Sequence, residues 1–81
     1  MENRVALVSI IVKDLNVVEE LNDMLHQYSS YIIGRMGLPY REKEMHIISV
    51  AIDAPSDIIN ALSGKIGKLP GISSKVAYAN E

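Results

Sequence analysis

The chain has 81 residues and a formal net charge of −2, with charges of both signs interspersed along it. This length predicts one domain over residues 1–81, and a hydrophobic content of 48% is too high for a disordered chain. The absence of cysteine excludes disulfides, thiolate metal sites and thiol catalysis. No basic tract suits nucleic acid, and no apolar run has the length of a membrane span or the features of a signal peptide. We therefore expect a cytoplasmic protein.

The first predicted strand is Val5–Val12, which is apolar and β-branched on both alternating faces, as in a central strand. A turn over Lys13–Asn16 follows it. Asn16 is a suitable N-cap, and Glu19 stands three residues further on in a capping-box-like spacing. Apolar residues then recur at helical spacing, which predicts a first helix over Val17–Tyr28.

Two further strands are predicted after this helix. Tyr31–Leu38 has the composition of a strand but is weakened by Gly34 and Gly37. Met45–Asp53 is again apolar on both faces. The polar segment Pro39–Lys43 lies between them, which predicts a hairpin.

The second predicted helix begins with Ser56 as its N-cap and has Asp57 in its first turn, where a carboxylate suits the helix dipole. The glycines and lysines of Ser63–Lys68 invite comparison with phosphate loops and with the GxxG loop of KH domains. Their spacing, and their position at the end of a helix, favour helix termination instead. After a turn at Leu69–Gly71, Ile72–Ala79 is the last predicted strand.

An internal repeat supports this element order. A shift of 41 positions superposes the apolar positions of the two helices, and it superposes Leu7 and Ile11 on Ile48 and Ile52. Two βαβ halves predict an α+β ferredoxin-like sandwich of ACT type. Its four-stranded antiparallel sheet would carry two helices on one face, with the first and third strands innermost.

The same repeat assigns the two faces of the first strand. Leu7, Ser9 and Ile11 match inward positions of the third strand, so they are expected to lie under the helices. The residues left to point outward, beside Ala51, are apolar and should not face water in a soluble protein. We therefore predict a homo-oligomer, a dimer or tetramer, whose interface contains Val8, Ile10, Val12 and Ile33, with Arg35 and Lys75 at its rim.

The segment from Arg35 to Arg41 is the candidate ligand site that the fold explains least. Arg35, Tyr40 and Arg41 place two guanidinium groups and a phenol at a strand end, and arginine forks suit carboxylate or phosphate ligands. A hairpin connection with solvated charges is the alternative interpretation. Lys13 and Asn16 are second choices, because the N-terminus of the helix that follows can hold an anion, although capping by Asn16 explains this turn equally well.

No cofactor, metal site or catalytic group is predicted. His26 and His46 lie on different elements without the spacing of a ligand pair, so we interpret them as surface or half-buried histidines. No Ser–His–Asp arrangement and no pair of carboxylates suits catalysis, so the chain is not expected to be an enzyme. Asp53 and Asp57 are interpreted as turn and cap residues.

Two segments carry a resemblance to a known family. Ile33–Tyr40 and Ser63–Ile72 resemble the stand-alone ACT-like proteins proposed to regulate the iron-only hydrogenase system, which accompany hydrogenase maturation genes in anaerobic bacteria. The chain is more distantly similar to the C-terminal domain of nickel-responsive repressors. Only His46 stands near the ligand positions of that family, so its nickel site is not expected here. ACT domains of amino-acid metabolism commonly carry a glycine where this chain has Lys13–Asn16, which argues against amino-acid binding.

The resemblance implies a small, non-enzymatic regulatory domain that senses a small ligand, with hydrogenase-related control as its role. The alternative is an assembly or scaffolding subunit that binds a protein partner through the open sheet face. Direct nucleic-acid binding is a third option, which the acidic charge disfavours.

Overall fold

The computed structural model describes residues 2–80 and has the predicted βαββαβ order. The ends of the predicted domain, residues 1 and 81, lie outside the described range. Two short 3₁₀ turns, η1 and η2, lie before the first helix and in the second strand connection. The elements are β1 (Asn3–Val12), η1 (Leu15–Val17), α1 (Val18–Gln27), β2 (Ile32–Tyr40), η2 (Arg41–Lys43), β3 (Met45–Pro55), α2 (Ser56–Gly67) and β4 (Ile72–Tyr78).

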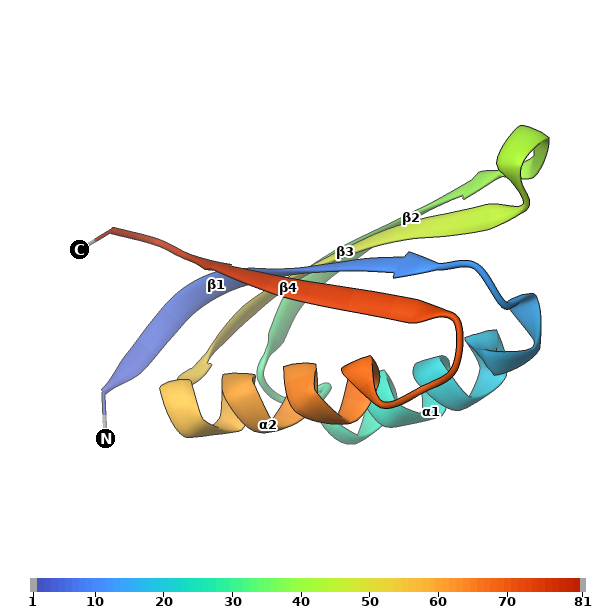
Figure 1. Ribbon diagram of the computed structural model, residues 1–81. Helices are drawn as coiled ribbons and strands as arrows, with labels where there is room; N and C mark the ends of the chain where they lie inside the picture. The colour runs from blue at the N-terminus through green and yellow to red at the C-terminus, as the bar shows by residue number, and fades with distance from the viewer. Residues whose placement is uncertain (1, 81) are drawn as a thin grey trace.

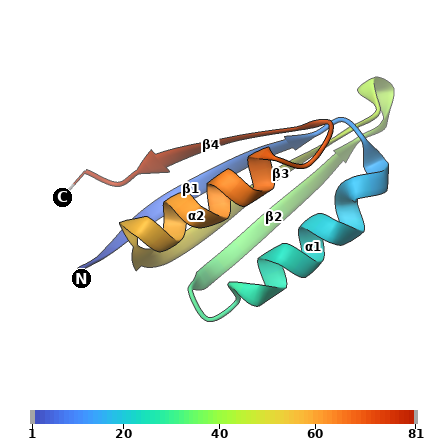
Figure 2. The same cartoon turned by 60° about the horizontal axis from the view of Figure 1, so that its bottom comes forward.

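The four strands form one antiparallel sheet in the order β2-β3-β1-β4. β1 and β3 are the inner strands, as their apolar composition predicted. Both helices cover the same face of the sheet, and the other face carries no helix (Figures 1 and 2). The ferredoxin-like α+β fold predicted from the repeat is therefore confirmed.

The core is the layer of side chains between the sheet and the two helices. The inner strands β1 and β3 contribute alternate residues, each helix contributes residues three or four positions apart, and the edge strands contribute only partly buried side chains. Complete burial of a Val, Leu or Ile side chain stabilises a fold by about 1.5–3 kcal/mol. The buried side chains are Ala6, Val8, Ile10, Val12, Val17, Leu21, Leu25, Ile48, Val50, Ile52, Ala54, Ile59, Leu62 and Ile66.

The prediction of which β1 residues face the helices was wrong. Val8, Ile10 and Val12 are fully buried under the helices instead of pointing outward, while Leu7 and Ile11 are exposed on the far face. A register error of one residue moves every side chain of a strand to the opposite face, because the side-chain period is two. The predicted interface residues on β1 therefore belong to the core.

The cause of this error lies in the connection between β1 and α1. The repeat of 41 positions holds for the helices, where Leu21 and Leu62 are both buried. Leu21 follows the last buried residue of β1, Val12, by nine positions, but Leu62 follows Ala54 of β3 by eight. The 3₁₀ turn η1 accounts for the longer connection. Corresponding inward-facing residues of β1 and β3 are therefore separated by an even number of positions and not by 41.

The predicted helix caps were also wrong. Asn16 does not cap α1. Instead its backbone N–H donates a hydrogen bond of 3.0 Å to Oδ1 of Asp14, which caps η1. Ser56 is the first residue of α2, and the N-cap residue Pro55 makes no side-chain hydrogen bond. Asp57 does lie in the first turn, as predicted, and its Oδ1 accepts from the N–H of Ile58 at 3.0 Å.

The β2–β3 hairpin is longer than predicted and extends beyond the helix layer (Figure 1). β2 continues through Pro39 and Tyr40, which pair with His46 and Met45. Proline is tolerated there because β2 is an edge strand. Glu44 closes the hairpin at a φ of 52°, in the left-handed region.

Candidate binding surfaces

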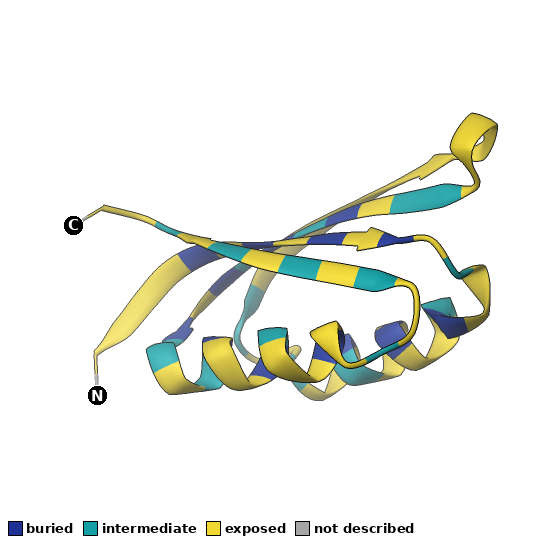
Figure 3. Ribbon diagram, in the orientation of Figure 1, coloured by how far each residue is buried: buried dark blue, intermediate teal, exposed yellow. Residues whose placement is uncertain are grey.

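The sheet face without helices, called the open face below, is largely apolar. It carries Leu7, Ser9 and Ile11 of β1 and the residues that pair with them across the sheet. Figure 3 shows how exposed and buried residues alternate along the strands. A contiguous apolar surface of this kind is typical of an interaction site. Its large exposed apolar side chains are Val5, Leu7, Ile11, Met36, Leu38, Tyr40 and Ile47.

The residues predicted at the edge of this surface have different positions. Lys75 pairs with Ser9 on the edge strand β4, so it lies at the rim of the open face. Arg35 pairs with Val50, which is buried under the helices, so Arg35 lies on the helix side of the sheet instead. Ile33 is exposed, but it sits at a shift in the β2–β3 register, so strand pairing does not assign it to either face.

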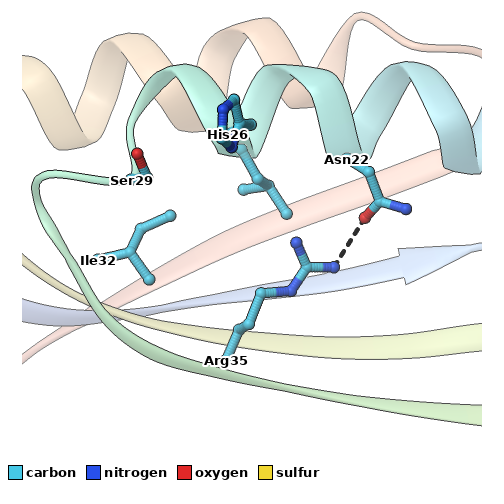
Figure 4. A pocket seen from close by; sticks show the side chains of 6 residues that line it. Asn22, His26, Ser29, Ile32 and Arg35 are labelled. Atoms are coloured by element: carbon cyan, nitrogen blue, oxygen red, sulfur yellow. Dashed lines mark hydrogen bonds between the residues drawn. The ribbon is translucent and has the colours of Figure 1, made fainter.

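Arg35 projects into a hollow between α1 and β2 (Figure 4). Its Nη2 donates a hydrogen bond of 2.8 Å to Oδ1 of Asn22 on α1, which fixes the position of the guanidinium group. The hollow has a volume of about 250 Å³. Its lining residues are Asn22, Leu25, His26, Ser29, Ile32 and Arg35.

The chemistry of this hollow suits a small oxyanion. The acceptor that holds Arg35 is a neutral amide and not a carboxylate, so this contact leaves the positive charge available. Guanidinium presents five N–H donors, and the Asn22 bond uses one of them. The exposed imidazole of His26 and the hydroxyl of Ser29 add polar groups beside it. Carboxylates and phosphates accept paired hydrogen bonds from an arginine fork, which neutral ligands do less well.

Tyr40 and Arg41 lie in a separate hollow at the end of the hairpin. Tyr40 Oη donates a weak hydrogen bond of 3.4 Å to Oε2 of Glu42. Five strand positions separate Tyr40 from Arg35, which at about 3.3 Å per residue is roughly 17 Å. The predicted grouping of Arg35 with Tyr40 and Arg41 therefore does not form one site. This second hollow, of about 280 Å³, is lined by Leu15, Pro39, Tyr40, Arg41, Glu44, Met45 and His46.

Lys13 and Asn16 are not part of either hollow. Lys13 lies beside Ile72 and Ser73 in a third hollow, and its backbone N–H donates to the carbonyl oxygen of Gly71 at 2.7 Å. Asn16 lies in the η1 turn, where Asp14 engages its N–H. Of the predicted ligand residues, the geometry places Arg35 alone in the hollow beside α1.

The companions of Arg35 were missed from the sequence. Asn22 and His26 lie four residues apart on the side of α1 that faces β2, and Ser29 follows in the turn after the helix. That spacing was available in the sequence, but a polar helix side usually faces water. Only the position of β2 beside α1 shows that these polar groups surround an arginine.

The two histidines are far from forming a pair. His26 is exposed and His46 is half-buried, as predicted, and they line different hollows. Within residues 2–80 no three His, Asp or Glu side chains gather where a metal ion would need them. Neither helix in that range is both long and apolar enough to span a bilayer.

Comparison with known proteins agrees with the fold. The element order and the helix-free sheet face define a small ferredoxin-like α+β domain. The model of the TM1266-like family, described as "Iron-only hydrogenase system regulator, putative", matches residues 4–76, so the chain belongs to this family. The resemblance predicted from the two sequence segments is therefore confirmed.

A solved structure extends this comparison to nearly the whole chain. The uncharacterized protein TM1266 from Thermotoga maritima is 34% identical and superposes with a TM-score of 0.93. The alignment covers 98% of this chain and 100% of that one. No functionally curated protein matches the chain.

Proposed function

We propose that this chain is a non-catalytic, cytoplasmic regulator of the iron-only hydrogenase system that responds to a small oxyanion bound beside Arg35. The family description supplies the system. The Arg35 hollow supplies the ligand chemistry, which is a carboxylate or phosphate group held by the guanidinium fork.

The observation that carries this proposal is the neutral partner of Arg35. A structural arginine on a protein surface commonly pairs with a carboxylate, which neutralises it. Here Asn22 orients the guanidinium without neutralising it, and Leu25 and Ile32 provide an apolar base to the hollow. A ligand with an anionic group and a short apolar part would match both features.

The first test is a thermal-shift titration with inorganic phosphate, acetate and citrate. A ligand at about 100 times its Kd stabilises the folded state by about 2.7 kcal/mol, which raises the melting temperature measurably. Arg35→Ala should abolish the shift. Asn22→Asp should abolish it too, because a carboxylate at position 22 would pair with Arg35 and neutralise the hollow.

Arg41→Ala is the matched control, since it removes a guanidinium from the other hollow and should leave the response intact. The proposal fails if none of the anions shifts the melting temperature. It also fails if Arg35→Ala retains the full response.

A second candidate function is that of an assembly subunit that binds a protein partner. The exposed apolar side chains of the open face favour it. This surface lies on the side of the sheet opposite to the Arg35 hollow, so the two functions are compatible in one molecule.

A further inference from the structure

Strand pairing arranges the side chains of the open face in rows that cross the sheet. The middle row, through Ser9, consists of Met36, Ser49, Ser9 and Lys75. On one side lies a row that is bulky over its first three strands: Leu38, Ile47, Ile11 and Ser73. On the other side lies a row in which only one side chain is large: Gly34, Ala51, Leu7 and Ala77.

This arrangement is complementary to itself. Consider a second copy stacked on this face by a two-fold axis that lies parallel to the sheet and runs along the middle row. Its strands run opposite to those of the first copy, and each outer row of one copy lies over the other outer row of its partner. Leu38 of one copy then faces Gly34 of the other, and Ile47 faces Ala51. Large residues opposite small ones let the layers of stacked sheets interdigitate. Ile11 faces Leu7, which gives an apolar contact on β1.

The β2–β3 hairpin contributes large apolar side chains to this face. β3 pairs with β1 as far as His46, so the hairpin extends beyond β1 as a two-stranded ribbon only at the pair Tyr40–Met45. On the open face it carries Met36, Leu38 and Ile47, and Met36 is 68% exposed. On the helix side the corresponding β2 positions are Gly37 and Pro39, which offer little to pack against.

We propose that the open face is covered by a second copy of this chain, stacked sheet to sheet about this two-fold axis. This proposal is independent of ligand binding at Arg35.

The size of the face is sufficient for such a dimer. Four strands about 4.8 Å apart and roughly eight residues long at about 3.3 Å per residue give a footprint of roughly 500 Å². Two copies would bury about 1,000 Å² or more, which reaches the lower limit of about 1,000 Å² that a specific interface needs.

The charge of the face also favours a second copy over a strongly charged partner. Among the paired positions of this face the charged side chains are one acid, Asp53, and one base, Lys75. The axis brings the two Lys75 side chains toward each other at the outer edges of β4. There their long stems can cover apolar surface while the ammonium groups reach water.

Sedimentation velocity on the full chain and two β1 variants tests this arrangement. The wild-type chain should sediment as a dimer at micromolar concentration. Leu7→Lys and Ile11→Glu should each shift it to monomer, because each homodimer would bury unpaired charges. A one-to-one mixture of the two variants should return to dimer. In the mixed dimer the lysine introduced at position 7 of one chain would face the glutamate introduced at position 11 of the other, while the second Leu7–Ile11 contact stays intact.

Leu15→Glu is the matched control. Leu15 is 52% exposed, against 48% for Leu7, but it lies in η1, outside the three rows that face each other across the proposed axis. This variant should remain dimeric, and circular dichroism should show native helix content in all variants.

A monomeric wild-type chain would overturn the proposal, and capture of a different protein by that monomer would assign the face to a heterologous partner. A wild-type dimer that persists in Leu7→Lys would place the interface elsewhere. A mixture that stays monomeric would contradict the proposed axis.

Discussion

Gly71 occupies a position that other residues fit poorly. Its φ is +70°, and a Cβ added there would lie 2.6 Å from Cβ of Asp14 and 2.9 Å from the Asp14 nitrogen. Its carbonyl accepts the hydrogen bond from Lys13, so this contact ties the start of β4 to the β1–α1 turn. The sequence predicted a turn here, but it carried no sign of this close approach.

We expect Gly71→Ala to lower the free energy of unfolding by at least 1–2 kcal/mol, the approximate cost of a left-handed L-residue. The clash with Asp14 adds to that cost because its backbone must move. Urea denaturation followed by circular dichroism measures the change. An unchanged midpoint would show that the turn tolerates a side chain.

Arg35 shows what single residues reveal in the sequence and what they do not. Its residue type, and the expectation that its segment lies at a strand end, were enough to name it as a ligand candidate, although Arg35 lies within β2. Which face it occupies depends on the pairing of β2 with β3, including the register shift after Ile32. A shift of this kind has no clear signature in the sequence, so Arg35 was placed at the rim of the wrong face.

Helix α2 contains a glycine that its surroundings do not require. Gly64 is exposed, and an added Cβ would have no neighbour within 4 Å. Glycine costs a helix interior about 0.8–1.0 kcal/mol relative to alanine. Gly64→Ala should therefore raise the free energy of unfolding by up to about 1 kcal/mol.

The same urea titration measures this change. Gly71→Ala serves as the comparison, because its expected change in the free energy of unfolding has the opposite sign. A loss of stability in Gly64→Ala would contradict this prediction.

The order of the elements was predictable, and the faces of β1 were not. Helical periodicity and β-branched runs depend on local composition, which a single sequence carries directly. Which residues of a strand face inward depends on whether the connection to the next helix has an odd or an even number of residues. The turn η1 makes the connection after β1 one residue longer, so the inward-facing set changes. Both faces of β1 are apolar, so composition did not reveal the error.

At the scale of the whole molecule, the two candidate surfaces lie on opposite sides of the sheet. The Arg35 hollow lies on the helix side, between α1 and β2 (Figure 4). The open face lies on the other side. Loss of the anion response would leave the dimer unaffected, and a monomeric chain would leave the anion response unaffected, so failure of one proposal is distinguishable from failure of the other.

The most direct test of the central proposal is a ¹H–¹⁵N correlation spectrum of the wild-type chain titrated with phosphate and with citrate. We predict that the shifting amides cluster at Asn22, His26, Ser29 and Arg35, with saturable dependence on ligand concentration. The same titration of Asn22→Asp should show no such shifts. Shifts centred on Lys13 and Gly71 or on Tyr40 and Arg41, or no saturable shifts at all, would contradict the account.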